Sequence, residues 1–274
     1  MFCKTLLTTV LLFSASAAQA GFIVYDFAGA NPAAITPTRD AFRAAVGGGT
    51  TAGANGSFGG VRREINWDGV SNTLADPNLL PADFFNTTSP RGAVFSTPGT
   101  GFMVSANTGQ ASPVLFGFPN DFQTFSTQRL FTALGSPITD VHFFVPGTTI
   151  AATTSAFGVV LADVETTLIS KIEFFDQNNS LIFSQNATET GNQGLSFLGG
   201  VADAGERISR VRITSGLNTI ISNGVLGNQI DDNVVMDDFL YAEPVKLSEP
   251  PTLVLLALGL LAGLARRRSR RAAP

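Results

Sequence analysis

Alternating apolar and polar positions dominate the middle of the chain. Residues 22–27 alternate in this way, and from residue 91 onward short runs of β-branched and aromatic residues are separated by turn residues. A period of two is typical of strands with one buried face, and regular turns between short strands are typical of a sandwich. The pattern predicts an all-β fold, a jelly-roll-like β-sandwich over residues 21–245. The predicted strands after the first are 93–96, 102–105, 114–116, 129–131, 140–145, 157–161, 171–175, 181–183, 195–198, 208–213 and 234–241.

One short helix is predicted near the start of this domain. Thr36 is a suitable N-cap, Pro37 suits the first turn, and the apolar spacing around Phe42 fits one helix face before three glycines end it. The Gly-, Ala- and Ser-rich residues 47–60 predict a flexible loop. Residues 176–180, Asp-Gln-Asn-Asn-Ser, predict a hairpin turn between two strands.

The first twenty residues have the pattern of a secretory signal peptide. A basic Lys4 precedes an apolar stretch, and small residues then lead to Ala18 and Ala20. This A-x-A spacing predicts cleavage before Gly21. The alternative is an uncleaved anchor, for which the apolar run is short.

The other end predicts a linker at 246–251, a transmembrane helix at 252–265 and an arginine-rich cytoplasmic tail at 266–274. The fourteen residues of the apolar segment reach about 21 Å as a helix, less than the ~30 Å of a hydrocarbon core. Basic residues after a span hold that end in the cytoplasm, so the β domain is expected on the far side of the inner membrane. The residues expected to carry sorting are Glu249, Pro250, Pro251, Arg266, Arg267 and Arg268.

This tail resembles the PEP-CTERM sorting signal of exported proteins in exopolysaccharide-producing Gram-negative bacteria. Glu249 and Pro250 fit the motif, whereas Ser248 stands where the motif has proline. The resemblance implies recognition by exosortase, a membrane protease, and transfer to the cell surface or extracellular matrix. A plain membrane anchor is the alternative.

The middle of the chain is similar to an uncharacterised family of exported PEP-CTERM proteins. The resemblance implies a cellular location and a fold, but it implies no activity because none is established for that family. It rests on residues 62–70, 89–92, 95–99, 143–148 and 235–241.

Charge and cysteine content narrow the function classes. Between residues 21 and 247 the chain has 20 acidic and 11 basic residues. An acidic domain argues against nucleic acid, whose backbone needs clustered Lys and Arg. The one cysteine, Cys3, lies in the predicted signal peptide, which argues against disulfides and cysteine-bound metals in the mature protein.

Clustered aspartates before and within the last long strand predict a structural calcium site. Asp231, Asp232 and Asp238 supply the hard oxygen ligands that calcium prefers. Because neighbouring strand residues point to opposite faces, we expect only one of Asp237 and Asp238 to join residues 231–233. The alternative is a solvated acidic turn.

The densest polar and aromatic segment surrounds the single tryptophan. Trp67 lies between Asn66 and Asp68, a composition typical of carbohydrate contacts, with an aromatic plate beside groups that bind hydroxyls. The alternative places Trp67 in the core and Asp68 in a turn.

Enzyme motifs are scarce. A single histidine, His142, cannot supply a multi-histidine metal site, and within a strand it is typically a packed or surface residue. Glycosidases need only two carboxylates, so Glu64, Asp68, Glu165 and Glu173 stay candidates. The sequence predicts a non-enzymatic surface protein that engages exopolysaccharide. The alternatives are a polysaccharide hydrolase or lyase, and a purely structural matrix component.

Overall fold

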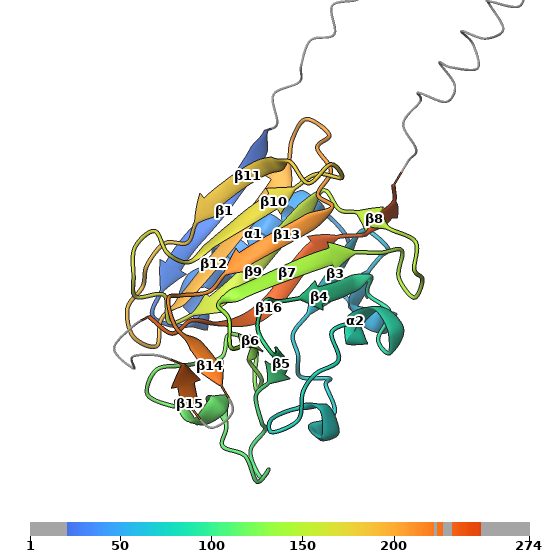
Figure 1. Cartoon of the computed structure of the whole chain (residues 1–274). Helices are drawn as coiled ribbons and strands as arrows, with labels where there is room; N and C mark the ends of the chain where they lie inside the picture. Colours follow the sequence, from blue (N-terminus) through green and yellow to red (C-terminus); the bar gives the residue numbers. More distant parts are fainter. Residues whose placement is uncertain (1–20, 222–223, 227–231, 248–274) are drawn as a thin grey trace, which may run out of the picture.

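The computed structural model describes residues 21–221, 224–226 and 232–247, and they fold mainly into β-sheet (Figure 1). The predicted signal peptide, membrane segment and arginine tail lie outside these residues, as does Asp231. Among the described residues, no helix is both long and apolar enough to cross a membrane. β1 (Phe22–Gly29) begins, and β17 (Val245–Lys246) ends, at the same end of the molecule (Figure 1).

A large sheet of eight strands forms one layer. Its main order is β1-β12-β9-β16-β3-β2, with β6 also bonded to β16 and β5 bonded to β6. All of these pairings are antiparallel. The strands after β1 are β2 (Ser57–Phe58), β3 (Arg62–Ile65), β5 (Gly101–Val104), β6 (Phe131–Leu134), β9 (Ala156–Ala162), β12 (Leu195–Ala202) and β16 (Val235–Ala242).

A small sheet of five antiparallel strands packs on one face of the large sheet, in the order β11-β10-β13-β7-β4. Two minor ladders, β14–β15 and β17–β8, complete the strands. The bounds are β4 (Ala93–Ser96), β7 (Ile138–Phe143), β8 (Ala152–Thr153), β10 (Lys171–Phe175), β11 (Leu181–Asn186), β13 (Arg210–Thr214), β14 (Thr219–Ile221) and β15 (Gly224–Leu226). The arrangement confirms the predicted all-β sandwich, and the predicted turn at 176–180 joins β10 to β11.

The two sheets enclose the larger core. Alternation puts Ile172, Phe174, Val211 and Ile213 on the inner face of the small sheet, while Arg212 on the same sheet is partly exposed. The large sheet contributes inner-face residues from β9, β12 and β16 to this core. Period-2 patterning therefore sets the packing as well as the strands.

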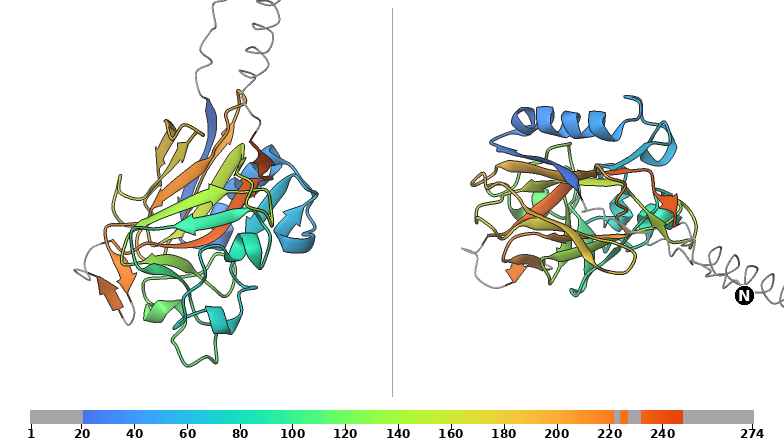
Figure 2. Two further views of the ribbon diagram at one scale, coloured as in Figure 1. Left: turned by 45° about the vertical axis from the view of Figure 1, so that its right-hand side comes forward. Right: turned by 90° about the horizontal axis from the view of Figure 1, so that it is seen from above.

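α1 (Pro32–Val46) covers the opposite, outer face of the large sheet, which Figure 2 shows from above. Phe42 is fully buried there and makes edge contacts with Phe197 and Tyr25. Its ring lies over Gly158 and Gly199, which pair across β9 and β12; a Cβ on Gly199 would be 3.0 Å from the ring. The glycine pair lets the helix approach the sheet closely.

The start of the helix differs from the prediction. Asn31, not Thr36, is the N-cap: its side chain accepts a hydrogen bond from Ala34 N at 3.1 Å, and Pro32 occupies the first turn. Pro37 lies inside the helix. Asn31 and Pro32 are as suitable an N-cap and first-turn residue as Thr36 and Pro37, and they lie about one and a half turns closer to the N-terminus. The helix therefore begins there and is longer than predicted. The predicted end before Gly47 is confirmed.

Two further local predictions need correction, and two short elements were not predicted. Residues 114–116 do not form a strand; η3 (Leu115–Gly117) is a 3-10 turn. Residues 47–60, predicted as a loop throughout, include η1 (Ala54–Gly56) and β2. η2 (Asn72–Leu74) and the short α2 (Phe84–Thr87) had no clear signal in the sequence, because both are far shorter than the roughly 11–18 residues over which a helical period can be recognised.

Candidate functional site

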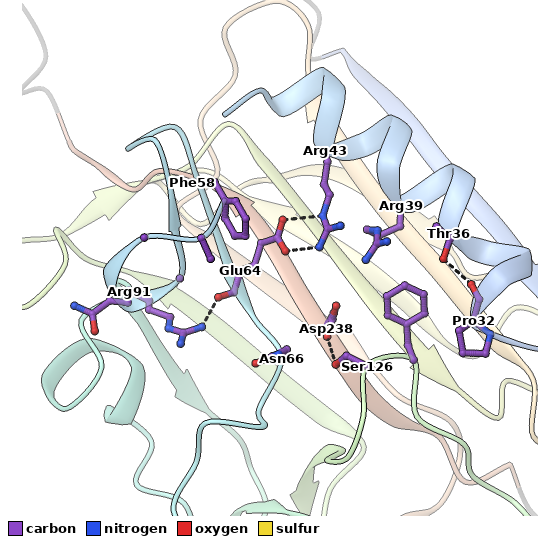
Figure 3. Close-up of a pocket in the computed structure, with 15 residues that line it drawn as sticks. Pro32, Thr36, Arg39, Arg43, Phe58, Glu64, Asn66, Arg91, Ser126 and Asp238 are labelled. Carbon is purple, nitrogen blue, oxygen red and sulfur yellow. Dashed lines mark hydrogen bonds and ion pairs between the residues drawn. The ribbon is translucent and has the colours of Figure 1, made fainter. Parts of the chain in front are cut away.

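A polar pocket of about 670 Å³ opens between α1 and the outer face of the large sheet (Figure 3). α1 forms one wall, and residues 52–58 with Arg91 form the wall opposite. Glu64 of β3 and Asp238 of β16 come from the sheet, and Phe125 and Ser126 close the remaining side. The volume is in the range of small-molecule sites.

Helix periodicity places two arginines of α1 at this pocket. Ile35 and Phe42 face the sheet, and Arg39 and Arg43 follow them on the flank of the same face. The side chain of Arg39 is only 13% exposed, and its guanidinium carbon lies 4.8 Å from the centre of the Phe125 ring. Burial lowers the pKa of Arg39, and the charge of Arg43 adds to this effect.

Glu64 is held by two arginines. Its carboxylate accepts hydrogen bonds from Arg43 Nε at 2.8 Å, from Arg43 Nη2 at 2.5 Å and from Arg62 Nε at 2.7 Å. Arg91 donates to the backbone oxygen of the same residue. β3 is therefore tied both to α1 and to Arg91, which fixes the width of the pocket.

A β-bulge brings Asp237 and Asp238 to the same face. The pairing of β16 with β9 shifts between Met236 and Phe239, which both point into the core between the sheets. The two aspartates between them lie beside Ser126, whose hydroxyl is 3.1 Å from Asp237 Oδ1 and 2.7 Å from Asp238 Oδ1. The prediction that they point to opposite faces is wrong because a bulge adds one residue to the strand.

The two carboxyls form a buried pair, of which Asp238 lines the pocket. Asp237 also accepts a hydrogen bond from Phe125 N at 2.6 Å. Burial raises the pKa of both groups, and the charge of Asp238 raises the pKa of Asp237 further. Two like charges in contact favour a shared proton, so this pair carries less negative charge than its two residues suggest.

Trp67 does not contact solvent, which corrects its prediction as a carbohydrate plate. It is 1% exposed, stacks on Phe131 with ring centroids 3.9 Å apart, and donates from Nε1 to Asp237 O at 2.8 Å. Its φ of 64° is left-handed, which turns its side chain away from the strand alternation. Asn66 is exposed and lines the pocket, whereas Asp68 accepts from Gln128 N and Arg129 N.

Two of the predicted calcium ligands, Asp232 and Asp238, have separate partners within the protein. Asp232 is buried and accepts from Glu165 N at 3.2 Å and Thr166 N at 2.9 Å, while Asp238 faces Ser126. Within residues 21–221, 224–226 and 232–247, no group of three or more His, Cys, Asp or Glu side chains could hold a metal ion. Asp232 instead satisfies the backbone of a loop, a common use of aspartate. Asp231 is outside the described residues.

Asp163 lies close to Asp232 and provides a test of pH dependence. Burial, with smaller contributions from Glu165, Asp121 and Asp232, raises the pKa of Asp163 to about 7. The folded state therefore binds more protons than the unfolded state between pH ~4 and ~7, and its free energy of unfolding falls as pH rises through that window.

We expect Asp163→Asn to remove this slope. Asparagine tolerates the φ of 73° and can still accept the 2.9 Å hydrogen bond from Gln193 N. Urea unfolding of both proteins at several pH values should show the variant gaining stability relative to the wild type from pH ~4 to ~7. A difference that is constant with pH would contradict the assignment.

The other proposed catalytic residues are dispersed. Glu165 is in the exposed loop after β9, and Glu173 pairs with Lys171 at 3.1 Å on the small sheet. His142 is also on the small sheet, with Nε2 3.0 Å from Ser96 Oγ. Of the four carboxylates considered from sequence, only Glu64 lines the pocket.

Most of this pocket could not be predicted from the sequence. Arg39, Arg43, Arg91 and Ser126 come from three separate segments, and their convergence depends on tertiary structure. Only the spacing of Arg39 and Arg43 beside the buried Phe42 offered a signal.

We found no significant match of the chain to a family model, to a curated protein or to a solved structure.

Proposed function

We propose that the chain is an exported surface or matrix protein, delivered by a PEP-CTERM-type tail, whose β domain binds exopolysaccharide without cleaving it. Exosortase is the proposed partner in sorting, with residues 252–265 as a transient transmembrane helix. We further propose a jelly-roll topology for the sandwich. The tail pattern in the sequence supports this localisation. The start of β1 and the end of β17 lie at the same end of the molecule, which suits attachment there (Figure 1).

The pocket beside α1 is the main support for the proposal that the domain binds a saccharide. It combines the guanidinium of Arg39, the exposed amide of Asn66, the Ser126 oxygen as an acceptor, and the ring of Phe125, one face of which lies against Arg39. These groups match the oxygens and the apolar ring faces of saccharides, and the volume admits a short oligosaccharide segment.

The arrangement favours binding over hydrolysis. Both oxygens of Glu64 already accept hydrogen bonds from Arg43 and Arg62, so this carboxylate is engaged within the protein and is not free for proton transfer to a substrate. Asp238 is next to it in the pocket and is the one carboxyl that supports the alternative of a hydrolase or lyase.

The test uses the protein purified from the surface of an exopolysaccharide-producing host. The protein should be retained on the host's polysaccharide and should release neither reducing ends nor unsaturated products. Release of either product would establish the enzyme alternative. Absence of both retention and release would indicate a purely structural matrix component.

A further inference from the structure

The charges of the pocket point to a more specific ligand. Arg39, Arg43 and Arg91 line it, three of the eleven basic residues between positions 21 and 247, although the domain as a whole is acidic. The same lining has two carboxyls, Glu64 and Asp238. The pocket therefore concentrates positive charge in a protein whose net charge is negative.

Two of the three arginines are already engaged. Arg43 forms a two-bond contact with Glu64. Arg91 donates to Glu64 O and to Ser89 Oγ, and its guanidinium carbon lies 5.0 Å from the centre of the Phe85 ring. Neither side chain is free to hold a ligand through its full set of donors.

Arg39 differs from both. Its Nε forms an ion pair with Asp40 Oδ1 at 2.7 Å, and the Asp40 side chain is 53% exposed. The Arg39 guanidinium projects into the pocket, where it makes no hydrogen bond or ion pair with another of the pocket residues drawn (Figure 3). Because the ion pair with Asp40 uses Nε, the two terminal nitrogens can still donate charge-assisted hydrogen bonds to an anion in the pocket.

We propose that this pocket binds the carboxylate of an acidic sugar, a uronate unit, and that Arg39 is its anchor. The inference rests on the proposed function and names the class of saccharide. The guanidinium fork of Arg39 matches a carboxylate in geometry. The exposed amide of Asn66 can bind ring hydroxyls, and the Ser126 oxygen, whose proton is donated to Asp238, can accept from one. The Phe125 ring under Arg39 limits how the arginine side chain can turn.

Titration calorimetry of the exported protein with glucuronate tests the proposal. Glucose is the matched neutral sugar and acetate the matched small anion. We expect binding of glucuronate, a dissociation constant for glucose at least about tenfold higher, and weaker binding of acetate. Equal binding of glucose and glucuronate would overturn the role of the carboxylate, and equal binding of acetate and glucuronate would mean an adventitious ion only.

Arg39→Gln should raise the dissociation constant for glucuronate about tenfold or more. Arg39→Lys keeps the charge but lacks the two-pronged guanidinium, so its dissociation constant for glucuronate should lie between those of Arg39→Gln and the wild type. The control is Arg212→Gln, which makes the same charge change on the small sheet, where Arg212 contacts Asp140 at 2.8 Å. Its affinity for glucuronate should equal that of the wild type. Wild-type affinity in Arg39→Gln, or equal losses in the two glutamine variants, would refute the anchor.

Retention on polysaccharide separates this inference from the proposed function. If Arg39→Gln stays on the polysaccharide as well as the wild type does, the function stands and the Arg39 pocket is the wrong site. If the wild type itself is not retained, the proposed function fails, whatever glucuronate does.

Discussion

Replacing Trp67 by alanine is expected to lower the free energy of unfolding by about 3–5 kcal/mol. The indole is buried among aromatic rings, with Phe85 at 5.4 Å and Phe239 at 5.1 Å between centroids in addition to the stacked Phe131. Truncation would leave a large cavity and would remove the hydrogen bond to Asp237 O. Urea unfolding measures the loss.

Two further variants serve as controls for the stability loss in Trp67→Ala. Leu181→Ala removes a side chain that is 54% exposed and should change stability by less than about 0.5 kcal/mol. Trp67→Phe keeps an aromatic ring and should cost less than Trp67→Ala. A loss below about 1 kcal/mol in Trp67→Ala would contradict the core assignment and would restore the surface alternative.

Replacing Glu64 by alanine should cost about 3 kcal/mol or more. The change leaves Arg43 and Arg62 without their shared counter-ion, and the side chain of Arg62 is only 4% exposed. The penalty comes from the uncompensated buried charge rather than from the lost bonds alone. Thermal or urea unfolding near neutral pH measures it.

The matched control is Glu173→Ala. It also removes one carboxylate from an ion pair, but its partner Lys171 is 33% exposed, so the loss should be about 0–1 kcal/mol. Similar losses at both positions would show that the Glu64 cluster behaves as a surface pair, and the rigid-pocket description would then fail.

The β-sheet content was predictable because one buried face imposes a period of two. β10 is an example: Ile172 and Phe174 are buried, whereas Lys171, Glu173 and Phe175 are partly exposed. Helix ends were harder, since Asn31 and Thr36 are both good caps and the choice depends on how α1 meets the sheet.

The site was less predictable than the fold. Composition around Trp67 suggested a sugar contact, yet a left-handed residue turns the indole into the core and leaves Asn66 at the pocket. The bulge at Asp237 and Asp238 likewise cannot be derived from strict alternation. Arg39 became a candidate only when the structure placed it beside residues distant in sequence.

Mass spectrometry of the surface-localised protein tests export and sorting, the central claim, most directly. The account predicts a mature N-terminus at Gly21 and a C-terminus before Arg266, because signal peptidase and exosortase each remove one end. A surface-localised protein that still carries Arg271 would contradict sorting, and one that still carries Met1 would contradict cleavage of the signal peptide.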